Sequence, residues 1–214
     1  MRSHSLGLRA TLAISVAIAA CLPIQGQTDA AVSIYGAFSG TTIGQAVREV
    51  PSNAAGGMIE VRHIVNPLMG FEAAYGLNRA NQVDYAPLYC SLCAPIPVSA
   101  NAHEITGDWV FSSRGARFRP FALVGVGVLY FQPLVSVQYN RSAPTQSSTT
   151  AAYVYGAGID WEVRSHLGLR LQYRGNLYNA PDLSLAFGTG SGPGHNGTVF
   201  THAAEPAIGV DYRF

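Results

Sequence analysis

The sequence contains no lysine, and all thirteen of its basic residues are arginine. Charged residues make up 12% of the chain, about half the share found in an ordinary soluble protein. After position 27, eleven arginines stand against twelve acidic residues, so the two signs nearly balance and no run of like charge occurs. This composition excludes the basic patch that nucleic-acid binding requires, and we expect no nucleic-acid partner.

Cysteine is also scarce, with three residues in the chain. Cys21 ends the stretch Ile18-Ala19-Ala20-Cys21, which either closes an apolar run or forms a lipobox that would place a lipid on Cys21. Cys90 and Cys93 form a Cys-x-x-Cys pair, for which a local disulfide, free thiols and a redox or metal role are the alternatives. No second cysteine pair completes a zinc site, so the sequence indicates no metal and no cofactor.

A long apolar run is missing as well. The apolar stretch 10–20 follows Arg2 and Arg9 and is shorter than the roughly 20 residues that span a bilayer. Its length and its basic start are typical of a secretory signal peptide, so we predict a signal peptide over residues 1–27 and one domain over residues 28–214. If the mature chain enters a membrane, it must do so as a barrel, because only helices and closed barrels satisfy their backbone hydrogen bonds in lipid.

What the sequence has instead is alternation of apolar and polar residues. Eight segments show this period of two, which indicates β-strands, and most approach the roughly 9–11 residues of a tilted barrel strand. Tight turns near residues 65–67, 113–116 and 164–166 alternate strictly with long connections at 40–57, 78–102, 131–150 and 178–200. Outer-membrane barrels have short periplasmic turns and long extracellular loops. The pattern therefore predicts an all-β fold, an eight-stranded antiparallel up-and-down transmembrane β-barrel, with segments at 31–39, 58–65, 68–77, 103–112, 117–130, 151–163, 167–177 and 201–214.

The two faces of these segments are sharply sorted. In the last one, Tyr212 and Phe214 share the apolar face, whereas Asp211 and Arg213 share the other. A charge at the bilayer midplane costs about 2–4 kcal/mol, so we assign the apolar phase to lipid and the charged phase to the barrel lumen. His63 is the one polar misfit on the apolar phase, and it lies beside a tight turn. The predicted lumen charges are Glu60, Arg62, Glu72, Glu104, Asp108, Arg117, Arg119, Asp160, Glu162, Arg170, Arg174, Glu205, Asp211 and Arg213.

A secreted lipocalin-like barrel or sandwich would also alternate, but with its apolar phase inside. Three features favour the membrane. Aromatic residues gather near both ends of the segments, as in interfacial girdles. Glycines share the charged face, where they leave room for long side chains, and the chain ends on Phe214.

Four stretches resemble the later strands of small outer-membrane barrels, namely residues 119–127, 155–161, 166–174 and 205–214. The chain is thus similar to the outer-membrane protein β-barrel domain family, which includes OmpA transmembrane-domain-like and OmpX-like proteins. The resemblance implies export to the bacterial outer membrane, insertion by the barrel assembly machinery among lipid and lipopolysaccharide, and an assembly signal that includes Tyr212 and Phe214.

An eight-stranded barrel is just wide enough for its side chains to fill it. Charges in such a lumen must pair and accept or donate hydrogen bonds, because desolvating them alone is prohibitive. We therefore expect a polar core that closes the lumen near its periplasmic half. The expected pairs are Arg170 with Asp160 and Asp211, and Arg119 with Asp108 and either Asp160 or Glu162.

These observations predict a structural or surface-interaction barrel, serving adhesion or envelope integrity, whose long loops meet a host or surface ligand. A narrow passive channel and a lipid-modifying enzyme are the alternatives. For the enzyme, His195 and His202 lie in or beside the last long connection with Ser184 and Ser191 nearby, but no acid is spaced to orient a histidine base. We therefore expect no catalysis.

Overall fold

The computed structural model describes residues 27–44, 47–66, 68–85, 95–113, 117–134, 136–138, 141–143, 145, 147–181, 183 and 199–214. Apart from Gln27, the predicted signal peptide lies outside these residues, as do Cys90 and Cys93. Within the described ranges, no helix has the length and apolar character needed to cross a membrane.

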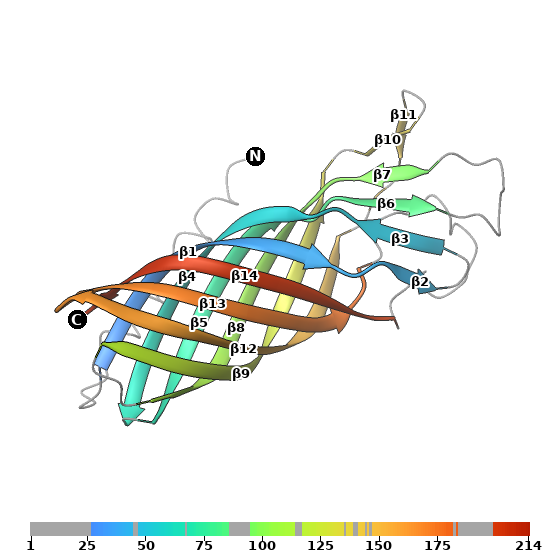
Figure 1. Cartoon of the computed structure of the whole chain (residues 1–214). Helices are drawn as coiled ribbons and strands as arrows, with labels where there is room; N and C mark the ends of the chain where they lie inside the picture. Colours follow the sequence, from blue (N-terminus) through green and yellow to red (C-terminus); the bar gives the residue numbers. More distant parts are fainter. Residues whose placement is uncertain are drawn as a thin grey trace, which may run out of the picture.

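Eight long strands close into one antiparallel barrel in the order β1-β14-β13-β12-β9-β8-β5-β4 (Figure 1). Each barrel strand pairs with the barrel strand that follows it in the chain, and β1 closes the ring by pairing with β14. The predicted fold class is therefore confirmed. The strands are β1 (Gln27–Ser39), β4 (Ala54–Asn66), β5 (Met69–Arg79), β8 (Ala100–Ser112), β9 (Phe118–Pro133), β12 (Ser148–Arg164), β13 (Leu167–Asn179) and β14 (Phe200–Arg213).

The short connections lie at the end of the barrel that carries the C-terminus (Figure 1). Between β4 and β5, the side-chain oxygen of Asn66 accepts hydrogen bonds from the backbone amides of Leu68 and Met69, both at 3.0 Å. Such an Asx turn reverses the chain within a few residues, so no loop is needed at this end. We call this the turn end of the barrel.

The opposite end carries structure that the sequence did not predict. Four short strands from the first two long connections form a sheet of order β2-β3-β6-β7, which we call the platform sheet. Figure 1 shows it beyond the barrel rim, with the hairpin of β10 and β11 beside β7. For the first three long connections, the expectation of loops throughout was therefore wrong. The added strands are β2 (Thr42–Gly44), β3 (Val47–Pro51), β6 (Gln82–Tyr85), β7 (Ile96–Val98), β10 (Ser136–Gln138) and β11 (Arg141–Ala143).

The outer and inner surfaces of the barrel follow the predicted phase. The outward side chain of Ile34, for example, is 69% exposed, whereas the inward Glu60 is fully buried. An apolar surface that encircles the whole barrel has no counterpart on a soluble monomer, whose exposed apolar patches are small. Lipid is the solvent that this surface fits.

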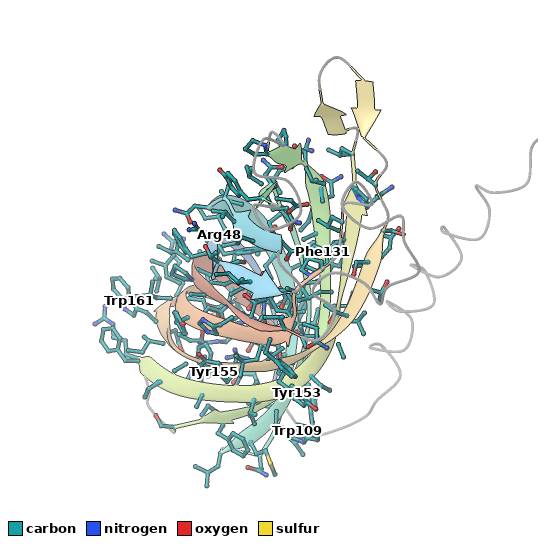
Figure 2. The ribbon with its side chains drawn as sticks, turned by 90° about the vertical axis from the view of Figure 1, so that its right-hand side faces the viewer. Arg48, Trp109, Phe131, Tyr153, Tyr155 and Trp161 are labelled. Atoms are coloured by element: carbon teal, nitrogen blue, oxygen red, sulfur yellow. The ribbon has the colours of Figure 1, made fainter. Side chains whose placement is uncertain are left out.

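Aromatic side chains form a girdle at each end of that surface. At the turn end Phe118 stacks on Trp161, with ring centroids 5.8 Å apart, and His166 stacks on Tyr212 at 5.9 Å. At the platform end the hydroxyl of Tyr75 bonds to the His103 ring at 2.8 Å. Figure 2 shows Trp109 and Trp161 projecting from the outside of the barrel. Amphipathic rings at two levels are typical of membrane barrels.

The pairing of β1 with β14 is interrupted at one place. Their register runs from Asp29–Arg213 to Tyr35–Ala207 and resumes only at Phe38–Ala204. Pro206 lies in the gap, and proline has no backbone N–H to offer a neighbouring strand. The closing seam of the barrel is therefore weakest beside Pro206.

Candidate functional site

The lumen of the barrel collects most of the predicted charges. Arg117 is exposed, and Arg119 and Glu162 are partly exposed near the turn end, so these three lie at the rim of the lumen. The other eleven are buried: Glu60, Arg62, Glu72, Glu104, Asp108, Asp160, Arg170, Arg174, Glu205, Asp211 and Arg213.

Arg170 on β13 is the centre of the network and is fully buried. Its Nε donates to Asp160 at 2.7 Å across the β12–β13 pair, where the two residues face each other in register. Its terminal nitrogens reach Asp29 on β1 at 3.1 Å and Glu72 on β5 at 3.4 Å. One guanidinium thus links strands from both sides of the barrel.

Glu72 on β5 is the matching carboxylate hub. Arg62 on β4 contacts it through Nη2 at 2.6 Å and through Nε at 2.8 Å. Arg174 on β13 donates to its second oxygen at 3.0 Å, and Arg170 lies 3.4 Å away. Because buried ions are tolerated only when they are paired and hydrogen-bonded, removing any of these partners leaves uncompensated charge in the lumen.

The network spans the full width of the lumen. Arg62 also donates to Asp160 on β12 at 2.9 Å, a contact between strands that are not neighbours. Its guanidinium lies 4.1 Å from the centre of the Phe121 ring, which adds a cation–π contact. Arg62, Arg170 and Glu60 are at most 1% exposed to a water-sized probe. A water-filled path beside them would expose them, so these side chains fill the barrel at this level.

Two expected pairs are corrected by the structure. Arg119 faces Asp160 in register, but it donates to Gln27 at 3.2 Å and forms no ion pair with a described carboxylate. Asp160 is already occupied by Arg62 and Arg170, which explains the difference. Asp211 is also not a hydrogen-bond partner of Arg170, and both of its oxygens lack such a partner among the described residues.

Several network residues were missed from the sequence. Asp29 is one of them, because it precedes the start predicted for the first segment, yet it binds Arg170. The others are uncharged: Ser33 donates to Glu60 at 2.9 Å, Thr106 accepts from Arg174 at 2.8 Å, and Gln172 donates to Glu60. Only their position in the sequence could have identified these residues, since each shares the inward phase of its strand with a charged residue.

The candidate catalytic residues do not form a described site. Ser184, Ser191 and His195 lie outside the described residues. His202 lies on the outer surface, where its Nε2 is 2.9 Å from the hydroxyl of Tyr155. Among the described residues, no group of three or more histidine, cysteine, aspartate or glutamate side chains is placed to hold a metal ion.

The end of the chain completes the closing seam. The amide of Phe214 donates to the carbonyl of Thr28 on β1 at 3.0 Å. Tyr212 and Phe214 meet edge to face, with centroids 5.2 Å apart, and Phe214 is 76% exposed on the lipid side. The predicted assembly signal therefore lies on an accessible outer surface at the turn end.

The closed barrel, its apolar outer belt and its paired polar lumen define an outer-membrane β-barrel protein. The chain belongs to the outer membrane protein beta-barrel domain family, which it matches over residues 8–214. Its location is accordingly the bacterial outer membrane. No curated protein matches it significantly in sequence.

Solved structures of similar fold come from several bacteria. OprG of Pseudomonas aeruginosa superposes with a TM-score of 0.59 at 14% identity, covering 88% of this chain and 96% of that one. Neisserial surface protein A gives a TM-score of 0.55 at 12% identity, covering 87% and 97%. Ail, the attachment invasion locus protein of Yersinia pestis, gives 0.54 at 13% identity, covering 89% and 100%. Identities this low establish a shared fold and nothing more.

Proposed function

We propose that the protein is a surface-interaction barrel, in which a closed transmembrane anchor holds an extracellular binding platform. The observation that carries this proposal is the platform sheet itself. Two connections that are far apart in the chain pair through β3 and β6, from Arg48–Tyr85 to Pro51–Gln82. A paired sheet holds its exposed side chains in fixed positions, which lowers the entropy cost of binding.

The filled lumen supports the anchor part of the proposal and argues against a channel. We expect the purified protein to give no steady conductance in planar bilayers in potassium chloride. A general porin measured alongside is the positive control. Stable single-channel steps that disappear in a variant with a bulkier lumen would favour a narrow passive channel instead.

The binding part concerns the exposed surface of the platform, where Arg48 of β3 lies (Figure 2). Arg48 and Arg79 are exposed at this end, and guanidinium groups suit sulfate and carboxylate ligands. Ail has been solved in complex with the heparin analogue sucrose octasulfate. An acidic glycan at a host surface is therefore the ligand class that we test first.

The test is adhesion of bacteria that express the protein to cultured cells, with soluble heparin as competitor. We expect at least a tenfold gain in adherent bacteria, and loss of that gain in a variant whose residues 41–53 and 81–98 are replaced by short turns. A variant that lacks only residues 136–143 is the matched control and should keep adhering. No gain with the intact protein would contradict the proposal.

The alternative of a lipid-modifying enzyme has a direct test. Mass spectrometry of lipid A from cells with and without the protein should show the same species. Lipopolysaccharide then acts as a solvating partner of the outer leaflet, and the barrel assembly machinery as a partner during insertion only.

A further inference from the structure

An arginine interrupts the apolar outer wall of the barrel at its platform end. Arg79 is the last residue of β5, is exposed, and continues the outward phase of Tyr75 and Leu77. Among the described residues of the eight barrel strands, no other charged residue occupies the outward phase at this end. An outward arginine is costly at the bilayer midplane and is tolerated near the interface. Arg79 therefore lies at the level of the lipid head groups.

Two amide side chains stand beside Arg79 on the same face of the sheet. Arg79 faces Asn101 of β8 in register, and Asn101 faces Gln132 of β9. Asn101 and Gln132 also hold the outward phase of their strands. The Cβ atoms of directly opposed residues on one face lie about 5 Å apart. A guanidinium and two amides, all N–H donors, are therefore within reach of a single anion.

His103 of β8 adds an imidazole one step closer to the membrane centre. It is two residues from Asn101 on the same face, and the hydroxyl of Tyr75 lies 2.8 Å from its Nδ1. The Tyr130 ring packs on its other side, with ring centroids 6.0 Å apart. The two tyrosines fix the ring and leave Nε2 to meet a further group. We call Arg79, Asn101, Gln132 and His103 the outer patch.

The outer patch borders the apolar belt on the side of the outer leaflet. The short turns of an outer-membrane barrel are periplasmic, so the platform end is extracellular. Next to the patch on the same strands, Ile105 faces Tyr75 and Val128 in register. Ile105 is 63% exposed and Val128 is 47% exposed on the lipid side. A ligand of the patch thus meets N–H donors at one end and an apolar wall at the other.

We propose that the outer patch binds a phosphate group of lipopolysaccharide, the lipid of the outer leaflet. A guanidinium donates to two phosphate oxygens at once, and amide and imidazole N–H groups can donate to the oxygens that remain. A phosphorylated lipid fits better than a free anion, because its acyl chains cover Ile105 and Val128. The four residues of the patch lie outside the ranges 41–53 and 81–98 that the adhesion test replaces, so the site can be tested separately from the surface-interaction role.

The test is a titration of the whole mature protein, refolded in a maltoside detergent that carries no phosphate, with complexes counted by native mass spectrometry. The probes are lipid A with its phosphates, the same lipid A after dephosphorylation, and inorganic phosphate. We expect phosphorylated lipid A to bind about tenfold more tightly than the dephosphorylated form, because charge-assisted hydrogen bonds are lost with the phosphates. Inorganic phosphate should bind weakly, since it has no acyl chains.

Three results of this titration would overturn the proposal. Equal affinity for the two forms of lipid A would mean that the acyl chains alone are bound. Inorganic phosphate that binds as tightly as lipid A would identify a site for free anions. Full displacement of lipid A by heparin would assign Arg79 to the acidic glycan instead.

Arg79→Gln should weaken the binding of phosphorylated lipid A about tenfold and leave the dephosphorylated form unchanged. His202→Phe is the matched control, because His202 lies 2.9 Å from the Tyr155 hydroxyl on the outer surface but has no outward arginine beside it. Arg48→Gln removes an exposed arginine from the platform and should also have no effect. Heat-modifiable gel migration shows that each variant is folded, and His103→Phe replaces Arg79→Gln if that variant fails this check. Unchanged affinity in the folded patch variant, or an equal loss in His202→Phe, would overturn the proposal.

Discussion

At the scale of single residues, Arg170 ties together four elements of the barrel. It binds Asp160, Asp29 and Glu72 while fully buried. Replacing it with methionine keeps the volume but leaves these carboxylates without their shared cation. We expect Arg170→Met to lower the free energy of unfolding by about 3–5 kcal/mol, as measured by urea titration in lipid vesicles. Arg119→Met is the control and should cost less than about 1 kcal/mol, because Arg119 is partly exposed and its one hydrogen-bond partner among the described side chains is Gln27. Similar losses in both variants would contradict a central role for Arg170.

Gly125 gives a second prediction at this scale. A Cβ atom at this position would overlap the Oδ1 of Asp108 and the carbonyl oxygen of Gly107. Asp108 is held in place by Arg174 at 2.9 Å, so it cannot move aside freely. We expect Gly125→Ala to destabilise the barrel by about 1–3 kcal/mol in the same titration. Gly57→Ala is the control, since no atom lies within 4 Å of its added Cβ. A stable Gly125→Ala protein would mean that the lumen repacks easily.

Which lumen residues are charged and inward could be predicted from the period of two, but their partners could be predicted only in part. Asp160 and Arg170 face each other on neighbouring strands, so register alone brings them together. The contact of Arg62 with Asp160 joins β4 to β12 across the lumen. Such a contact depends on the diameter of the barrel and on which arginines compete for the same carboxylate. Neither can be inferred from the alternation of residues within one strand. The predicted partners of Arg119 were wrong for that reason.

At the scale of elements, the barrel strands could be predicted from the sequence, whereas the platform strands could not. The barrel strands have eleven to seventeen residues, long enough for an alternating pattern to stand out. The strands β2 and β7 have three residues each, and β3 and β7 contain proline. Their pairing joins connections on either side of a barrel hairpin, which no short window of sequence reveals. The strands β2, β3, β6 and β7 therefore form a sheet in connections whose turn-rich composition predicted loops.

The seam between β1 and β14 gives a prediction for an element. Pairing stops between Tyr35–Ala207 and Phe38–Ala204, where Pro206 offers no amide hydrogen. We expect Pro206→Ala to restore a donor, to slow amide exchange at Gly36, which lies opposite it, and to raise stability by up to about 1 kcal/mol. The amide of Val32, in the paired part of the same strand, is the internal reference. Unchanged exchange at Gly36 would show that the seam opens for a reason other than the missing donor.

At the scale of the whole molecule, the barrel must be inserted as well as folded, and we predict that Phe214 contributes to insertion. Phe214 is 76% exposed, so its side chain adds little to the packing of the finished barrel. If it belongs to the signal read during assembly, Phe214→Ser should reduce the amount of protein in the outer membrane severalfold. The stability of the same variant refolded into vesicles should change by less than about 1 kcal/mol.

The matched control for Phe214 is Phe118, another outward aromatic residue at the turn end, 55% exposed and stacked on Trp161. Phe118→Ser removes a comparable apolar ring from the girdle but leaves the C-terminus intact. Quantitative blotting of outer-membrane fractions, with boiled and unboiled samples, separates yield from folding. Equal loss of yield in the two variants would attribute the effect to the aromatic girdle. A loss confined to Phe214→Ser would mean that the machinery reads the terminal residue itself, because the two side chains share their chemistry and differ in their place at the seam.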